Sequence, residues 1–571
     1  MVSLWGTTKR DDDDNESSEP RPGQPSRPSY ESREPDENTR LLGSQRQRHA
    51  DGYLDPNDPA ASCRSHVSPY NLWSVRFTRY LTVLILVVTF LWWVLLLVSI
   101  FVSPPGMHSR GSGFFDWSYT TLTLGNLLVA LLFFATPSAA MRVSAALIAL
   151  ILLVDMILIL SAKRIRLEEG WVGIASVVWA VVVAIWCVIA DRIVAWGKAE
   201  EEERLTGRPE TRRSLREWFA VFVSTIILAI YVIITVLMTA TLIIRARDAT
   251  LEMPGERYLV DGDKYAVHLS CVGNVTYTDE RKNPTILLEA GEHPSEYNFE
   301  HWAYSARQNN TISRFCYWDR PGYAWSDNAP SPHSAGMSAD ALSEALARAG
   351  EEGPWILVSA GIGSVTSRIF SSRHLREVTG IMMVDPMHED LLHRIGSASR
   401  GFILWGWGVI SPLGLQRIAA ALFKGRSRED RVYGRNAYQS GKYIKAQLQE
   451  NLVADSLSKS EVVSARAIQD RNTPVVLVSS GIEVRKSSEW ERKQRDLATL
   501  TDNLVAWEVV NKAPHQVWQT LEGRTVMESA LAELVKASAL YSKPWDGGER
   551  NGERKHGQKG KYKGERKSVA W

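Results

Sequence analysis

The sequence predicts two folded parts, a multi-pass α-helical membrane domain of about five spans and, after it, an α/β domain. Three observations predict this division. Long apolar stretches crowd the region from Tyr80 to Ile244. From about Leu251 to Lys543, short β runs alternate with helical stretches, the pattern of a sheet covered by helices. Both ends of the chain are polar and charged. We expect a tail at 1–79, the membrane domain at 80–248, the α/β domain at 249–542 and a second tail at 543–571.

The composition limits the classes of partner and cofactor. The chain holds 571 residues with a formal net charge of +2, so its overall charge does not point to nucleic acid. Its 21 tryptophans suit a protein that places amphipathic rings at membrane interfaces. The four cysteines show neither C-x-x-C nor histidine-rich spacing, which argues against a zinc site. We expect no metal, no cofactor and no nucleic acid, and a lipid bilayer as the main partner.

The two tails have too few apolar clusters to bury, so we expect both to be disordered. In the first tail, Glu37-Asn-Thr-Arg-Leu41-Leu42 resembles an acidic dileucine signal that sorting adaptors read at endosomes and vacuoles. Chance occurrence is the alternative, because the pattern is short. The second tail is basic and repeats Gly-Glu-Arg. It reads as a solvated tail, with contact to anionic surfaces as the alternative.

Five apolar stretches are each close to the roughly 20 residues that span a bilayer as a helix. Tryptophans lie at several of their edges, as interfacial anchors do. A buried core helix is the alternative for any single stretch, but five in succession argue against it. The predicted spans are 80–102, 117–136, 143–162, 171–190 and 218–244.

Asp155 lies near the middle of the third predicted span. A carboxyl group at that depth is costly and is a candidate functional residue by default. The alternative is a protonated or hydrogen-bonded aspartate that joins neighbouring helices. The sequence favours the alternative, because no second ionisable residue lies in mid-span to complete a relay.

Lysine and arginine in the short flanks predict the orientation of the spans. The side that holds the N-terminus carries more of them than the opposite side, although Glu200 to Glu203 dilute this excess. We therefore expect a cytosolic N-terminus and a lumenal or exoplasmic C-terminal domain. The glycosylation sequons at Asn274 and Asn309 both lie in that domain and agree with this orientation.

In the α/β part, apolar runs of five to seven residues predict strands at 265–271, 285–289, 313–318, 355–359, 380–384, 475–479 and 504–510. Helical stretches lie between them, for example at 338–349 and 486–500. From 391 to 455 runs an insertion that contains the apolar segment from Phe402 to Leu415. Pro412 and Arg417 argue against a sixth span there. We expect cap helices packed on the sheet, with contact to the bilayer or a hydrophobic pocket as the alternatives.

Four segments of this part resemble the α/β-hydrolase superfamily. They are His268-Leu-Ser-Cys271, Pro284-Thr-Ile-Leu-Leu-Glu-Ala-Gly291, Cys316-Tyr-Trp-Asp-Arg-Pro-Gly-Tyr-Ala-Trp-Ser-Asp327 and Val384-Asp-Pro-Met-His-Glu-Asp390. The combined layout resembles fungal multi-pass membrane proteins of unassigned function, some of them named as mitochondrial. In the fold that the resemblance implies, Cys271 and Cys316 lie on neighbouring strands. A disulfide between them would persist in an oxidising lumen.

The stretch from Trp355 to Thr366 reads as the strand, Gly-rich turn and helix of a nucleophile elbow, whose motif is G-x-S-x-G. When the motif is aligned with the end of the strand, its serine position falls on Gly361. Glycine has no side chain that could attack a substrate. The resemblance assigns the base to His515 and the acid to Asp385, with Glu483 as the alternative acid. The oxyanion hole would use backbone near Gly291 and Glu292 together with the amide of Ile362.

Two serines near the elbow are alternative nucleophiles. Ser359 has a glycine two residues later but lacks the preceding glycine of the motif. Ser364 lies in the first turn of the predicted helix, where a hydroxyl usually satisfies free amides. Glu292 would place a carboxylate beside the oxyanion pocket, where it opposes a developing anion.

We therefore predict a polytopic membrane protein whose α/β-hydrolase-like domain has lost its chemistry and acts in binding, assembly or regulation. The alternative is a membrane-bound serine esterase or lipase-like enzyme with a non-standard nucleophile. A transporter-like role would rest on Asp155 alone. We expect an endomembrane location (vacuole, endoplasmic reticulum or plasma membrane), with a mitochondrial membrane as the alternative. A lipid or other hydrophobic ligand and protein partners of unknown kind are further expectations.

Overall fold

The computed structural model describes residues 72–207, 213–278 and 280–541. The predicted tails therefore lie outside the described residues, apart from 72–79. The dileucine-like motif with Glu37, Leu41 and Leu42 lies outside them too.

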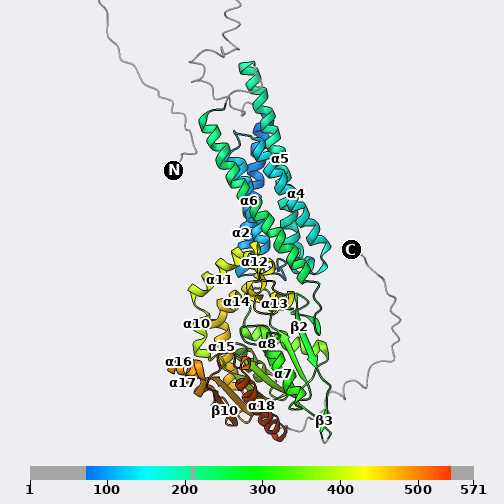
Figure 1. Ribbon diagram of the computed structural model, residues 1–571, viewed down its shortest axis with the longest axis vertical. Helices are drawn as coiled ribbons and strands as arrows, with labels where there is room; N and C mark the ends of the chain where they lie inside the picture. Colours follow the sequence, from blue (N-terminus) through cyan, green and yellow to red (C-terminus); the bar gives the residue numbers. More distant parts are fainter. Residues whose placement is uncertain (1–71, 208–212, 279, 542–571) are drawn as a thin grey trace, which may run out of the picture. The chain divides into compact units, whose positions relative to one another are not determined.

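Five long helices make up the membrane part (Figure 1). They are α2 (Trp73–Phe101), α3 (Phe114–Leu132), α4 (Ala139–Ser161), α5 (Lys163–Thr206) and α6 (Leu215–Asp248). In the described ranges, four of them are long and apolar enough to cross a membrane, namely α2, α4, α5 and α6. The first begins at Trp73, seven residues before the predicted start, so residues 73–79 belong to a helix and not to the tail.

The helix α3 covers most of the second predicted span but is not among those four. Its sequence is less apolar because it carries Asp116, Thr120, Thr123 and Asn126, and all four of these side chains are buried. Polar side chains of α3 therefore face protein. Asp155 of α4 accepts a hydrogen bond from the Tyr119 hydroxyl of α3 at 2.7 Å. This is the helix-joining arrangement that the sequence favoured for Asp155.

The α/β part is built on an eight-stranded sheet with the order β1-β2-β6-β5-β7-β8-β9-β10. The antiparallel pairs are β1 with β2 and β2 with β6, and all other neighbours are parallel. This is the strand order of the α/β-hydrolase fold, so the predicted fold is confirmed. The strands are β1 (Glu256–Val260), β2 (Tyr265–Val272), β5 (Thr285–Glu289), β6 (Phe315–Asp319), β7 (Trp355–Ala360), β8 (Val378–Val384), β9 (Val475–Ser480) and β10 (Leu504–Val510). The short strands β3 (Tyr277–Thr278) and β4 (Arg281–Lys282) form a separate hairpin.

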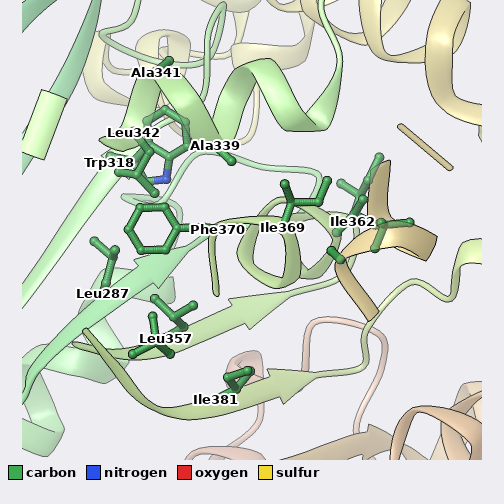
Figure 2. Close-up of a cluster of buried hydrophobic side chains, with 14 of the residues drawn as sticks. Leu287, Trp318, Ala339, Ala341, Leu342, Leu357, Ile362, Ile369, Phe370 and Ile381 are labelled. Atoms are coloured by element: carbon green, nitrogen blue, oxygen red, sulfur yellow. The ribbon is translucent and has the colours of Figure 1, made fainter. Parts of the chain in front are cut away.

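Helices cover both faces of the sheet and fix the position of the elbow. On one face lie α8 (Ala335–Ala349), α9 (Gly363–Arg373) and α15 (Lys459–Ile468). On the other lie α7 (Phe299–Gln308) and α18 (Leu521–Tyr541). Figure 2 shows Leu287, Leu357 and Ile381 of three adjacent strands beneath Ile369 and Phe370 of α9. These side chains are almost completely buried, which stabilises the start of α9 directly after β7.

The insertion between β8 and β9 is helical, with α10 (Leu392–Ile395), α11 (Ala398–Ile410), α12 (Leu415–Phe423), α13 (Arg428–Val432) and α14 (Gly441–Val453). The apolar segment packs differently from the cap packing that we expected. Leu404, Trp405 and Val409 of α11 pack in one cluster with residues of α2, α3 and α14. Phe402 and Trp407 of the same helix are exposed.

The predicted disulfide is present. Cys271 of β2 and Cys316 of β6 are register partners on neighbouring strands, and their sulfur atoms lie 2.06 Å apart. Both sequon asparagines are exposed on the same part of the chain. Asn309 follows α7, and its side-chain amide donates to the Glu528 carboxylate at 2.7 Å.

Candidate functional site

The elbow is formed by the backbone between β7 and α9. Gly361 occupies the turn with φ of +47°, a conformation that residues with a side chain rarely adopt. At Gly363 an added Cβ would lie 2.2 Å from the carbonyl oxygen of Ala290, so the loop after β5 approaches the first turn of α9 closely. The sharp, glycine-dependent turn of a nucleophile elbow is therefore present, and Gly361 has no side chain there.

Glu292 places its side chain at the empty elbow position. A Cβ built on Gly361 would lie 2.7 Å from each carboxylate oxygen of Glu292. The backbone N–H of Ile362 donates to Glu292 Oε1 at 3.3 Å. The resemblance to α/β hydrolases assigns this amide to the oxyanion hole. The carboxylate thus takes both the space of the missing side chain and one of the expected oxyanion donors.

His515 joins this carboxylate to the acid position. Its Nδ1 lies 2.6 Å from Asp385 Oδ2, and its Nε2 lies 3.2 Å from Glu292 Oε2. Asp385 is completely buried, and its other oxygen accepts from the Trp490 indole at 3.0 Å and from the Ser480 amide at 3.1 Å. With a carboxylate at each ring nitrogen, both nitrogens act as donors, so the ring is an imidazolium.

The position of His515 between two carboxylates shifts the pKa values of His515 and Glu292. Burial opposes the charge on His515, but Glu292 and Asp385 outweigh it and raise its pKa from 6.5 to about 11. Burial also opposes the charge on Glu292, but His515 outweighs it and lowers the pKa of this carboxyl from 4.5 to about 2. At neutral pH, the protonated form of His515 is therefore favoured.

These pKa values predict how the ion pair depends on pH. The raised pKa of His515 means that its stabilisation is complete below 6.5 and is lost as pH rises through about 11. The lowered pKa of Glu292 means that its stabilisation is complete above 4.5 and is lost as pH falls through about 2. We expect His515→Gln to lower the unfolding free energy at about pH 6 by more than at about pH 10, in denaturant titrations. The exposed His301→Gln serves as control. An equal effect of His515→Gln at both pH values would contradict the assigned charge.

The alternative residues make other contacts. Ser359 is completely buried within β7. The Ser364 hydroxyl donates to the Gly361 carbonyl at 2.7 Å, which differs from the bond to free amides that we expected. Glu483 lies after β9 and pairs with Lys486 at 3.3 Å. The structure thus brings Gly361, Glu292, Asp385 and His515 together.

Sequence reasoning missed the residues that support Glu292. The Tyr443 hydroxyl of α14 donates to the backbone carbonyl of Glu292, and Arg320 donates to the neighbouring carbonyl of Gly291. Arg320 also pairs with Glu450 at 3.0 Å. Arg320 lies in the segment that carries the resemblance, but Tyr443 and Glu450 lie in the insertion, where no motif marks them.

Two further clusters in the described part of the chain combine histidine with carboxylates at ligating distance. One consists of His268, Glu296 and Asp319, and both ring nitrogens of its histidine already face Asp319 and the Pro254 carbonyl. The other consists of His388, Glu389 and Asp496, whose acids also pair with Arg466. Either cluster would have to give up these bonds to hold a metal ion.

Comparison with known proteins identifies relatives of this chain. The profile of a family described as "Region of unknown function (DUF2417)" matches residues 37–271. An uncharacterized protein of Schizosaccharomyces pombe is 33% identical over 488 residues, which cover 80% of this chain and 90% of that protein. The chain belongs to the family of this protein. An uncharacterized vacuolar membrane protein of Saccharomyces cerevisiae is 25% identical over 57% of this chain and 59% of its own length. With its apolar helices, this family member is a multi-pass membrane protein.

Solved structures are similar to about half of the chain. The Cif epoxide hydrolase from Acinetobacter nosocomialis covers 53% of this chain and 96% of its own, with 13% identity and a TM-score of 0.39. The α/β hydrolase MGS-M2 from a deep-sea metagenome library covers 49% and 97%, with 10% identity and a TM-score of 0.37.

Proposed function

We propose that this protein acts in binding, assembly or regulation at a membrane, through an α/β-hydrolase domain that has lost serine-type catalysis. One observation carries the proposal: the Glu292 carboxylate occupies the place of the elbow side chain and is paired with His515. A nucleophile needs a neutral base within hydrogen-bond reach, and here the base is charged and paired on both sides. Negative charge at Ile362 N–H also opposes an oxyanion.

The experiment is an ester-hydrolysis assay on the full-length protein in detergent, with p-nitrophenyl esters of short and long acids. We expect the wild type and His515→Ala to show the same background rate. Without a triad nucleophile, at most about 10³–10⁴-fold acceleration over water remains, from binding and the oxyanion hole. Ester turnover above that range that His515→Ala abolishes would overturn the proposal.

A second candidate function is hydrolysis with Glu292 itself as nucleophile, and the same geometry favours it. One Glu292 oxygen would attack an electrophilic carbon of the substrate, and the leaving group would depart with the Nε2 proton of His515 as the carbon–oxygen bond to Glu292 forms. That ester bond removes the carboxylate charge, which is the principal interaction that raises the pKa of His515. His515 could then accept a proton from the water that hydrolyses the ester. Single-turnover reaction in ¹⁸O water tests this, because the heavy oxygen would enter Glu292.

In the membrane part we propose five crossings, with α3 as the inner helix. Its 19 residues extend about 28 Å, close to the thickness of the hydrocarbon core. Its buried polar side chains explain a lower hydropathy without placing it outside the bilayer. Five crossings put the two ends of the chain on opposite sides, which supports a lumenal α/β domain.

We also propose that the insertion between β8 and β9 forms a cap over the elbow through α14, while its helix α11 packs against the membrane helices. Tyr443 of α14 supports this role, because it contacts the backbone of Glu292. The exposed side chains of Phe402 and Trp407 suit contact with the bilayer surface or with a hydrophobic ligand. An endomembrane location fits the disulfide, and the vacuole fits the description of the Saccharomyces cerevisiae relative as a vacuolar membrane protein; a mitochondrial membrane is the alternative.

The orientation predicts glycosylation. In material from the native host, treatment with a glycan-removing amidase should increase electrophoretic mobility. Asn274→Gln combined with Asn309→Gln should abolish that shift, and Asn310→Gln, which lies outside the acceptor positions, should leave it unchanged. Cleavage of the α/β domain by protease added outside sealed vesicles of known cytosolic-side-out orientation would contradict the lumenal placement.

A further inference from the structure

A polar cavity lies where the ends of the membrane helices meet the α/β part. It measures about 100 Å³ and is lined by the N-terminal end of α5, the C-terminal end of α6, the loop before α3, and residues of α12, α13 and α14. Figure 1 shows α12 and α13 beside the end of α6, and contacts join both of them to that helix. The elbow residues Gly361, Glu292 and His515 are not part of its lining.

Cations outnumber carboxylates around this cavity. Five cationic side chains line it, namely Arg164, Arg245, Arg417, Arg431 and Lys442. Two carboxylates line it, Glu168 and Asp248. A third, Glu169, is not part of the lining but pairs with Arg245. Each lining carboxylate is shared between two arginines, since Glu168 pairs with Arg164 and Arg245 and Asp248 pairs with Arg417 and Arg431. The cluster therefore keeps positive charge that its own acids do not neutralise.

Two of these cations, Arg417 and Lys442, could make further hydrogen bonds or ion pairs. Arg417 is more than nine-tenths buried, and its Nε–H has no hydrogen-bond partner among the described residues. Lys442 donates to the Ala324 carbonyl at 2.7 Å, and no carboxylate of the described chain lies at ion-pair distance from it. Burial, offset in part by Glu168, lowers the pKa of Lys442 to about 8. An anion in the cavity would satisfy both groups.

The N-terminus of α14 points to the same chemistry. Its first residues, Gly441, Lys442 and Tyr443, line the cavity together with the preceding Ser440. The Ser440 side chain makes no capping hydrogen bond in the described structure. The first amides of a helix have no intrahelical acceptor, and together with the helix dipole they form an anion site.

We propose that this cavity binds a phosphate group, either the headgroup of an anionic phospholipid or free phosphate. A buried arginine fork, an ammonium group and a helix N-terminus are the donors that suit a tetrahedral oxyanion. The cavity lies at the ends of α5 and α6, so a bilayer that these helices cross would place its headgroup layer near the cavity. A bound phosphate would link the membrane helices to α12–α14 through these shared donors.

The test uses the full-length protein and two probes. The first is inorganic phosphate, measured as a concentration-dependent rise in melting temperature against chloride at equal ionic strength. The second is phosphatidic acid. The protein is reconstituted in phosphatidylcholine nanodiscs that either contain or lack phosphatidic acid, and native mass spectrometry counts the phosphatidic acid molecules that the released protein retains. The variants are Lys442→Gln and Arg417→Gln, and Lys459→Gln on α15 is the matched control outside the cavity. Before a variant is compared with wild type, its size-exclusion profile must show that it is folded. One folded variant of the two is enough for the test.

We expect wild type and Lys459→Gln to bind phosphate alike, and a cavity variant to bind about tenfold more weakly. Retention of phosphatidic acid that free phosphate displaces identifies the lipid headgroup as the source. Binding of phosphate with no preference for phosphatidic acid over phosphatidylcholine identifies the soluble anion. If phosphate leaves the wild-type melting temperature unchanged and phosphatidic acid is not retained, or if both folded variants bind like wild type, the site does not exist.

Discussion

Gly361→Ser combined with Glu292→Ala is expected to create a serine nucleophile that a phosphonate labels, although neither change alone should do so. Gly361→Ser alone leaves the Glu292 carboxylate 2.7 Å from the new Cβ, and His515 remains charged while the pair persists. Removing the carboxylate frees the Ile362 amide and lowers the pKa of His515, so the ring can serve as a base. A positioned base contributes about 10²–10⁴-fold, and we expect labelling by the double variant to exceed that of Gly361→Ser by such a factor.

Two controls make this result specific. Adding His515→Ala to the double variant should remove the labelling, because the serine then has no base. The double variant should also be less stable than Glu292→Ala by about 1–3 kcal/mol, since serine must adopt the positive φ of Gly361. Labelling by Gly361→Ser as strong as by the double variant would show that Glu292 does not block the site.

Loss of the disulfide is the second large effect that we expect. In the chain-entropy model, a bridge that closes a loop of 45 residues contributes about 3–4 kcal/mol. Cys271→Ala combined with Cys316→Ala should therefore lower the melting temperature of the α/β domain, measured in the full-length protein, by roughly 5–7 °C. The matched control is Cys187→Ala, because that thiol is free. Recovery of Cys271 and Cys316 as free thiols in non-reducing peptide mapping would contradict both the bridge and the oxidising compartment.

The strands were predictable because parallel strands are buried on both faces and read as continuous apolar runs. Seven strands of the sheet lie within two residues of their predicted positions. The eighth, β1, was missed because it is an edge strand that begins with the charged Glu256 and Arg257 and therefore lacks an apolar run. The helix α3 is harder to classify for a related reason, since its polar residues face other helices and dilute the membrane signal.

The site was predictable in its parts but not in its contacts. Strand ends placed Gly361, Asp385 and His515 at one edge of the sheet, and the loop after β5 placed Glu292 near them. The ion pair between Glu292 and His515 depends on side-chain direction, which sequence spacing does not specify. The support from Tyr443 depends on how the insertion folds back over the sheet, and no local pattern encodes that contact.

Peptide-mapped labelling of the wild-type protein with a serine-reactive phosphonate tests the central claim most directly. If the Glu292 carboxylate and the charged His515 close an elbow without a nucleophile, no serine of the domain should carry the phosphonate after prolonged exposure. Peptides that contain Ser359 and Ser364 should be recovered unmodified. An adduct on either serine that forms in the wild type and disappears in His515→Ala would contradict the account and establish a working serine hydrolase.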